Sequence, residues 1–361
     1  MNRFPLAAVM AAFFIALMWF VSLRQAVLFA VGVGMGSVLA GARFGFTTGW
    51  RRLIEQRDPS GVMAQLLLLG LAAAVSMPLL AAFPQDLVAA LGPPSFSLLI
   101  GAFVFGLAMQ VADGCGSGTL YKAGLGIPLN MAILPLFAIG SFMGSAQMDQ
   151  WLALGAMKPV GLVAEFGPLA AFAITCAGLL ALGWAALRWS GKAARWFDKR
   201  LVIGAVLLAI LAVLNLVIAG QPWGVVYGFG LWVAKIATVG GLFDPAANPF
   251  WSQPVNFGSL SQSVFLDVTS ITNIGILAGA LWVAARKSGT AAKPAPLTAK
   301  QWMVGIIAGF MLGYSSRLAF GCNIGAMVSG ISTGSLHGWI WVPLAFAGSL
   351  IGVRVRRHFN F

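Results

Sequence analysis

The fold is decided by two stretches of sequence, Gly106-Leu-Ala-Met-Gln-Val-Ala-Asp-Gly-Cys-Gly-Ser-Gly118 and Gly313-Tyr-Ser-Ser-Arg-Leu-Ala-Phe-Gly-Cys-Asn-Ile-Gly325. Aligned on their cysteines, Cys115 and Cys322, which are 207 positions apart, the stretches share three glycines and one alanine at equivalent positions. Each stretch predicts an apolar helix that breaks at a glycine, with a thiol at the break. Such duplication in a very apolar chain predicts two half-sites that meet inside a membrane.

The composition indicates a membrane protein. Of the 361 residues, 60% are hydrophobic and only 9% are charged, and the mean hydropathy is +0.91. No soluble domain could cover that much apolar surface with so few charges. We therefore predict an all-α polytopic membrane protein with about ten transmembrane helices, including broken or re-entrant half-helices. We expect one integral-membrane domain, 1–361, with two pseudo-symmetric halves at about 1–190 and 200–361.

The apolar pieces that lead into the two breaks are short. Phe96–Gln110 and Trp302–Tyr314 both fall below the roughly 20 residues that a crossing helix needs. Each is expected to resume after its glycine-cysteine step as a second short apolar piece. Discontinuous helices of this kind are tolerated only where protein or a water-filled cavity surrounds the exposed backbone.

The net charge of +13 does not indicate a nucleic-acid partner, because the basic residues gather in short loops between apolar spans. The basic clusters are Arg51–Arg57, Arg188–Arg200, Arg286–Lys300 and Arg354–Arg357. Positively charged loops stay on the cytoplasmic side of a membrane. With all four clusters on that side, both termini are predicted to be cytoplasmic.

Three cysteines are too few and too isolated for a disulfide framework. Cys176 lies in an unbroken apolar run, where a cysteine acts as a small hydrophobe. Cys115 and Cys322 differ because glycines let backbone approach a ligand closely, and a helix that starts after a break points its positive end at the break. We therefore predict that both line one anion path. The glycines expected to shape it are Gly114, Gly116 and Gly321.

Polar residues near the two breaks could contact an anion. Arg317 lies in an apolar stretch, and a charge at membrane depth is usually functional. Lys122 is a second candidate, although its side chain could instead extend to the membrane boundary. Asn323 follows the second cysteine and adds a polar contact. Asp113 beside the first cysteine is expected to pair with Arg317 or Lys122, or to be protonated.

Other chemistry finds little support in the sequence. Two histidines and no Cys-x-x-Cys make a closed zinc site improbable, and we predict no metal. The chain has no nucleotide-binding fingerprint, so no cofactor is expected. It also has no nucleophile-base-acid set, so we predict that it is not an enzyme, although either cysteine at a break could form a persulfide in principle.

The two motifs resemble the YeeE/YedE family of bacterial inner-membrane proteins, which is linked to the uptake of sulfur compounds. Gly-Cys-Gly-Ser-Gly-Thr-Leu-Tyr-Lys-Ala-Gly, Gly114–Gly124, is similar to the first-half signature of the family. Arg317–Gly325, followed by Gly334–Trp339, is similar to the second-half signature. The resemblance implies an inner-membrane protein with an hourglass shape, in which two repeats point inward.

The resemblance also implies import of thiosulfate, passed between cysteines by S–H hydrogen bonds and not chemically consumed. Cys115 and Cys322 match two of three such cysteines in the family. The third belongs to a stretch that reads Arg43-Phe44-Gly45-Phe46-Thr47 here, so that glycine replaces the thiol. A relay of three thiols cannot operate unchanged, and the hydroxyl of Thr47 or Thr48 is a hypothetical substitute.

Alternative functions stay open at this point. The chain could be a membrane sulfurtransferase in which a cysteine passes sulfur to a cytoplasmic carrier protein. It could be a scaffold for such carrier proteins. A selenium or other oxyanion could also replace thiosulfate as the substrate, and the missing thiol at Gly45 favours that variant.

Overall fold

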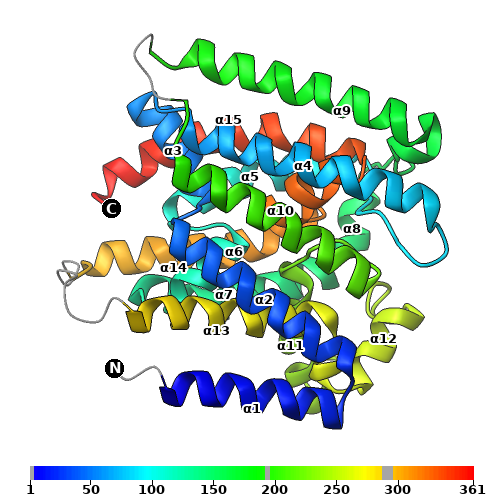
Figure 1. Cartoon of the computed structure of the whole chain (residues 1–361). Helices are drawn as coiled ribbons and strands as arrows, with labels where there is room; N and C mark the ends of the chain where they lie inside the picture. The colour runs from blue at the N-terminus through cyan, green and yellow to red at the C-terminus, as the bar shows by residue number, and fades with distance from the viewer. Residues whose placement is uncertain (1–3, 192–195, 287–295) are drawn as a thin grey trace.

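The computed structural model describes residues 4–191, 196–286 and 296–361, which form a bundle of helices (Figure 1). In chain order, the helices are α1 (Phe4–Phe20), α2 (Leu23–Ala42), α3 (Phe46–Gln56), α4 (Ser60–Ala82), α5 (Phe96–Val111), α6 (Gly116–Gly124), α7 (Pro128–Ala146), α8 (Met148–Leu152), α9 (Leu162–Trp189), α10 (Lys199–Ala219), α11 (Val226–Val239), α12 (Pro254–Ser261), η1 (Val264–Leu266), α13 (Val268–Arg286), α14 (Ala299–Leu318), η2 (Asn323–Gly330) and α15 (Leu336–His358).

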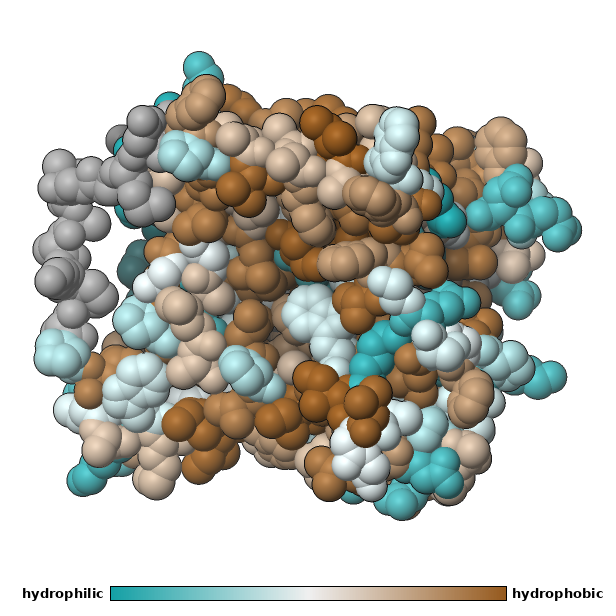
Figure 2. Space-filling model, turned by 90° about the horizontal axis from the view of Figure 1, so that it is seen from below, coloured by the Kyte–Doolittle hydropathy of each residue, from teal (hydrophilic) through white to brown (hydrophobic). Residues whose placement is uncertain are grey.

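Among the described residues, nine helical segments are long and apolar enough to cross a membrane, and α1 and α11 are apolar but shorter. The side of the molecule seen in Figure 2 is predominantly hydrophobic. Such a surface suits the hydrocarbon core of a bilayer, which offers no water to hydrogen-bond polar groups. The prediction of an all-α polytopic membrane protein is therefore confirmed.

The long helices lie side by side, and both chain termini are on the same side of the bundle (Figure 1). On that side Arg357 pairs with Glu55 at 2.8 Å, and Arg57 donates a hydrogen bond to the carbonyl of Trp189. We call it the basic end, and the opposite end, which carries α8 and α12, the distal end. Residues 192–195 and 287–295, which fall in two of the basic clusters, and residues 1–3 lie outside the described residues.

The two broken helices run in opposite directions. The carbonyl of Gln110, near the last residue of α5, accepts a 3.2 Å hydrogen bond from Arg356 at the basic end of α15. By contrast, α14 begins at the basic end, where Gln301 donates to the carbonyls of Phe359 and Asn360 at 3.1 and 2.7 Å. One broken helix therefore reaches the bundle interior from each end.

Equivalent glycines let each broken helix pack closely on its neighbour. A Cβ on Gly106 of α5 would overlap the carbonyl oxygen of Ala345 on α15. In the same way, a Cβ on Gly313 of α14 would overlap the carbonyl oxygen of Phe137 on α7. Close approach of backbones through small residues is how helices gain packing energy in lipid, where the hydrophobic effect no longer drives their association.

The backbone of the two breaks is nearly the same. Asp113 and Phe320 both adopt the left-handed conformation, with φ of 54° and 55°. The cysteines that follow have φ of −83° and −87° and a common ψ of −168°. In each break the glycine N–H donates a hydrogen bond to the carbonyl of the residue five positions earlier. The N···O distance is 3.1 Å for Gly114 and 2.8 Å for Gly321. The breaks predicted at the two glycine-cysteine steps are confirmed.

Two details of the broken helices differ from the sequence analysis. The piece predicted as Trp302–Tyr314 extends over all of α14, which has 20 residues, a crossing length. The polar residues Ser315 and Ser316 continue the helix because their hydroxyls donate hydrogen bonds to carbonyls of the preceding turn. Ser315 bonds the carbonyl of Met311, and Ser316 bonds that of Gly313. After the break the chain resumes as the π-helix η2, whereas α6 is an α-helix.

Candidate functional site

The two breaks meet in the interior of the bundle. The Sγ of Cys322 lies 3.0 Å, and its Cβ 3.4 Å, from the point that a Cβ on Gly116 would occupy. Gly116 directly follows Cys115, and the exposed fractions of the two cysteines are 1% and 0%. The structure therefore brings the predicted cysteines and Gly116 together, away from lipid. Phe137 lies against the same point, with its Cζ at 3.4 Å.

The thiol of Cys115 caps the helix that follows it. The N–H of Gly118 donates to Sγ at 3.4 Å, and the hydroxyl of Ser117 lies 3.5 Å from the same sulfur. The first turn of α6 thus points its unpaired N–H groups and its positive end at the thiol. Gly114 allows the turn to close, because a Cβ there would come within 2.8 Å of the backbone nitrogen of Thr119.

The second break has nearly the same backbone geometry, but the side chain of Cys322 makes no capping hydrogen bond to the helix that follows. Gly321 has φ of 151°, and a Cβ there would overlap the backbone nitrogen of Ala326, so only glycine fits. Asn323 begins η2 and is 0% exposed, yet neither atom of its side-chain amide has a hydrogen-bond partner in the described part of the chain. The amide is therefore free to bind a polar group that enters the site.

Further buried polar atoms lack a protein partner near the two breaks. Within the described residues they are Thr47 Oγ1, Arg51 Nη1, Gln110 Oε1, Thr119 Oγ1, Asn130 Oδ1 and Arg317 Nε. A buried polar atom without a partner costs roughly 1–3 kcal/mol. Six such atoms near the two breaks are best explained by water molecules or a polar ligand that hydrogen-bonds to them.

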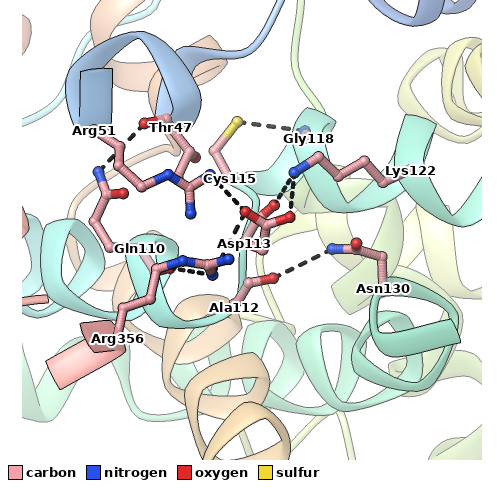
Figure 3. Close-up of polar contacts among 10 residues, drawn as sticks. All are labelled: Thr47, Arg51, Gln110, Ala112, Asp113, Cys115, Gly118, Lys122, Asn130 and Arg356. Atoms are coloured by element: carbon pink, nitrogen blue, oxygen red, sulfur yellow. Dashed lines mark hydrogen bonds and ion pairs between the residues drawn. The ribbon is translucent and has the colours of Figure 1, made fainter. Parts of the chain in front are cut away.

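Asp113, which follows α5 at the first break, is surrounded by basic side chains (Figure 3). Arg51 and Lys122 lie 2.6 Å from its two carboxylate oxygens, and Arg356 lies 3.6 Å from one of them. The predicted pairing with Lys122 is confirmed, and the alternative pairing with Arg317 is wrong. Lys122 bends back to Asp113, and its side chain is only 12% exposed.

Sequence reasoning missed two of these cations. Arg51 belongs to a basic cluster that indicates topology, and Arg356 lies near the C-terminus of the chain. Neither carries a local signal for the site, since α3 and α15 are brought to the first break only by packing of the bundle. The sequence did predict the break, and the carboxylate of Asp113 beside it indicated that cations lie nearby.

Arg317, near the C-terminus of α14, lies toward the distal end. Its guanidinium lies over the rings of Phe250 and Tyr227, at 5.1 and 5.8 Å from their centroids. Among the described residues, no carboxylate lies within ion-pair distance of it. Cation–π contacts stabilise the charge but leave it without a counter-ion. Arg317 is therefore an electrostatically attractive group for an anion.

The region of the missing third thiol lies next to α6. Gly45 has φ of −118° and ψ of 121°, a conformation open to any residue. A Cβ there would lie 3.0 Å from the hydroxyl oxygen of Thr48 and 3.6 Å from that of Tyr121. The hydroxyl of Thr48 thus lies beside the position of a cysteine side chain, while the carbonyl of Thr47 accepts a hydrogen bond from Gln110.

A polar cavity opens at the distal end. Its volume is about 470 Å³, and Tyr227, the residue under the guanidinium of Arg317, contributes to its wall together with Asn256 and Asp267. At the basic end a small hollow is lined by Arg43, Gly45 and Thr48, among others. The two hollows thus lie toward opposite ends of the molecule, and neither is lined by a residue of the two breaks. No group of three potential metal-binding side chains occurs in the described ranges.

Comparison with known proteins gives matches over most of the chain. A family model described as "Sulphur transport" matches residues 41–351. The chain is 25% identical over 331 residues to the thiosulfate transporter TsuA of Spirochaeta thermophila, covering 86% of this chain and 92% of that protein. It is also 35% identical over 80 residues to the probable transporter YedE of Escherichia coli, covering 22% of this chain and 19% of that one.

Proposed function

This chain belongs to the sulphur transport family, and we propose that it imports thiosulfate or a related small sulfur-containing anion along a path lined by Cys115 and Cys322. As a multi-pass membrane protein and a member of this family, it is a transporter of sulfur compounds. The relative matched over most of its length is a thiosulfate transporter, which supports that anion as the first substrate to test.

The proposal depends chiefly on one observation, the approach of the Cys322 thiol to Gly116, which directly follows Cys115, at the meeting point of two broken helices. Both sulfurs are buried, and the described hydrogen-bond partners of Cys115 Sγ are the Ser117 hydroxyl and the Gly118 N–H, so the thiols are suited to donate weak S–H hydrogen bonds. A sulfur anion accepts such bonds readily. The helix that starts after Cys115 and the unpartnered amide of Asn323 add further donors.

In the proposed order of events, the anion enters from the distal end, where Arg317 lacks a counter-ion and attracts it. It then passes Cys322, whose sulfur lies against Gly116, and the neighbouring Cys115, and exchanges one contact for the next. Weak successive contacts are required, because a site that binds tightly would not release its ligand. The anion leaves past Lys122 and Gly45 at the basic end.

Orientation follows from the distribution of charge. Basic loops remain on the cytoplasmic side, and the basic end carries Arg357, Arg57 and both described chain ends. We therefore infer that the basic end faces the cytoplasm of a bacterium, that both termini are cytoplasmic, and that the distal end faces outward across the inner membrane. Transport from the distal to the basic end is then import.

The test is uptake of radiolabelled thiosulfate into proteoliposomes, with sulfate and selenite as competitors. Uptake by the wild type is expected, and Cys115→Ala and Cys322→Ala are each expected to abolish it. Cys176→Ala is the matched control, because this free cysteine lies on α9 outside the breaks. Uptake that survives the loss of both thiols would refute the cysteine-lined path. Stronger competition by selenite than by unlabelled thiosulfate would indicate that selenite, and not thiosulfate, is the preferred substrate.

A further inference from the structure

We propose that Arg51, Lys122 and Arg356 form a second anion site on the cytoplasmic side of Cys115, and that Asp113 competes with the transported anion for it. The proposal rests on the proposed function and adds the step by which the anion is released. When the path is empty, the carboxylate of Asp113 forms ion pairs with the three cations. The arriving anion then replaces the carboxylate in some of these ion pairs. The carboxylate then returns and displaces the anion toward the cytoplasm.

The charges and distances of the cluster support this role. Three cations surround one carboxylate, so an excess of two positive charges remains, which would balance the two negative charges of a divalent oxyanion such as thiosulfate. Arg51, Lys122 and Arg356 come from α3, α6 and α15, so they converge only in the folded bundle (Figure 3). Their side chains and that of Asp113 are 12% to 23% exposed, so water and a small ion can reach them.

The cluster has hydrogen-bonding capacity that Asp113 does not use. The buried Nη1 of Arg51 has no partner among the described residues, although Nη2 of the same guanidinium contacts the carboxylate. The hydroxyl of Thr47, which is 3% exposed, also lacks a partner. A guanidinium binds an oxyanion best through two nitrogens, so a free Nη1 beside an occupied Nη2 suits an incoming anion.

Comparison of the two breaks shows that only the first break, at Cys115, has a carboxylate at this position. Asp113 corresponds to Phe320, with almost the same backbone conformation, so the fold does not require a carboxylate at this position. Gln110 likewise corresponds to Arg317. The second break, at Cys322, therefore has the cation Arg317 and no described ion pair with a carboxylate, whereas the first break, at Cys115, has three cations and a competing carboxylate. This asymmetry favours capture at the distal end and release at the basic end.

A purely structural explanation makes a different prediction. Asp113 could serve only to tie α3, α6 and α15 together, since its removal leaves three cations without a shared partner. In that case replacement would lower stability and leave the apparent affinity for the anion unchanged. Competition instead predicts tighter binding of the anion once the carboxylate is neutral, whatever happens to stability.

The deciding variant is Asp113→Asn, because asparagine keeps the size of the side chain and tolerates the left-handed backbone at this position. Equilibrium binding of radiolabelled thiosulfate to purified protein, and the KM and maximal rate of uptake, would be measured. We expect Kd and KM to fall about ten-fold and the maximal rate to fall as release slows. Glu55→Gln is the matched control, since it removes an ion pair of 2.8 Å at the same end outside the cluster.

A second variant gives the opposite sign and decides the matter if Asp113→Asn does not fold. Arg51→Gln removes one cation and should raise Kd and KM about ten-fold. An unchanged or higher KM in Asp113→Asn, or an unchanged KM in Arg51→Gln, would overturn the competition. If the wild type itself neither binds nor transports thiosulfate, the proposed function fails instead, so the two failures can be told apart.

Discussion

The sulfur of Cys322 lies 3.0 Å from the point where a Cβ on Gly116 would begin. Because Gly116 directly follows Cys115, no side chain separates the two breaks at their closest approach. The helix that starts at Gly116 therefore reaches the second thiol with its backbone. An anion that passes from Cys322 to Cys115 has to cross this contact, so its width should control the passage of the anion.

Replacing Gly116 by alanine should obstruct this point. The added methyl would come within 3.0 Å of the sulfur and 3.4 Å of Phe137, which is tight enough to displace the thiol. We expect uptake of thiosulfate to fall by about ten-fold, with a loss of stability of about 1–3 kcal/mol from overpacking. The control is Gly41→Ala, where nothing lies within 4 Å of the new methyl. Normal uptake by Gly116→Ala would place the path elsewhere.

Replacing Arg317 by glutamine should weaken uptake without lowering the stability of the protein. The guanidinium is held only by rings in the described part of the structure, so its loss removes attraction for an anion without breaking an ion pair. We expect KM for uptake to rise about ten-fold, and the melting temperature to stay the same or increase, because a buried charge without a counter-ion is costly. Arg200→Gln, at an exposed arginine that bonds the carbonyl of Gly41, is the control. A lower melting temperature with unchanged KM would assign Arg317 a structural role.

Placing a cysteine at Gly45 should test whether the path passes the position of the missing thiol. The backbone there accepts any residue, and the side chain of Thr48, whose hydroxyl oxygen and Cβ would lie at 3.0 and 3.2 Å, must shift slightly. We expect Gly45→Cys to be modified by a membrane-impermeant thiol reagent from the cytoplasmic side, with loss of uptake. Both proteins should carry Cys176→Ala, since Cys176 is partly exposed, and without Gly45→Cys the protein should resist, because its thiols at the breaks are 1% and 0% exposed. Full uptake by protein that mass spectrometry shows to be modified would contradict this route.

The equivalent glycines should respond alike to substitution. A methyl on Gly106 would overlap the carbonyl oxygen of Ala345, and one on Gly313 would overlap that of Phe137. Gly106→Ala and Gly313→Ala should each destabilise the protein by about 1–3 kcal/mol, which thermal unfolding in detergent would measure. Gly70→Ala should have little effect, since its nearest neighbour would be at 3.6 Å. A large effect at only one of the pair would argue against equivalent packing in the two repeats.

Much of the fold could be predicted because its signals are local. Hydropathy identified the membrane-spanning helices, and the glycine-cysteine steps predicted both breaks. The length of α14 was underestimated, because Ser315 and Ser316 look polar in sequence but bond carbonyls of their own helix. The division into halves stays a prediction, although the matched backbone at Cys115 and Cys322 supports a duplication.

The candidate site was only partly visible. The pairing of Lys122 with Asp113 could be foreseen, since the two lie nine positions apart around one break. Arg51 and Arg356 could not, because they come from other helices. The approach of Thr48 to Gly45 was raised only as one of two options, since side-chain direction after a helix start depends on the surrounding packing.

By itself, the sequence determined that the chain lies in a membrane, that two of its helices break, and that a cysteine lies at each break, because hydropathy and backbone sterics act over a few neighbouring residues. Only the tertiary structure decided that Cys322 faces Gly116 and that three cations converge on Asp113. Those contacts join helices that are distant in sequence, and they exist only once glycines such as Gly106 and Gly313 let the helices pack closely.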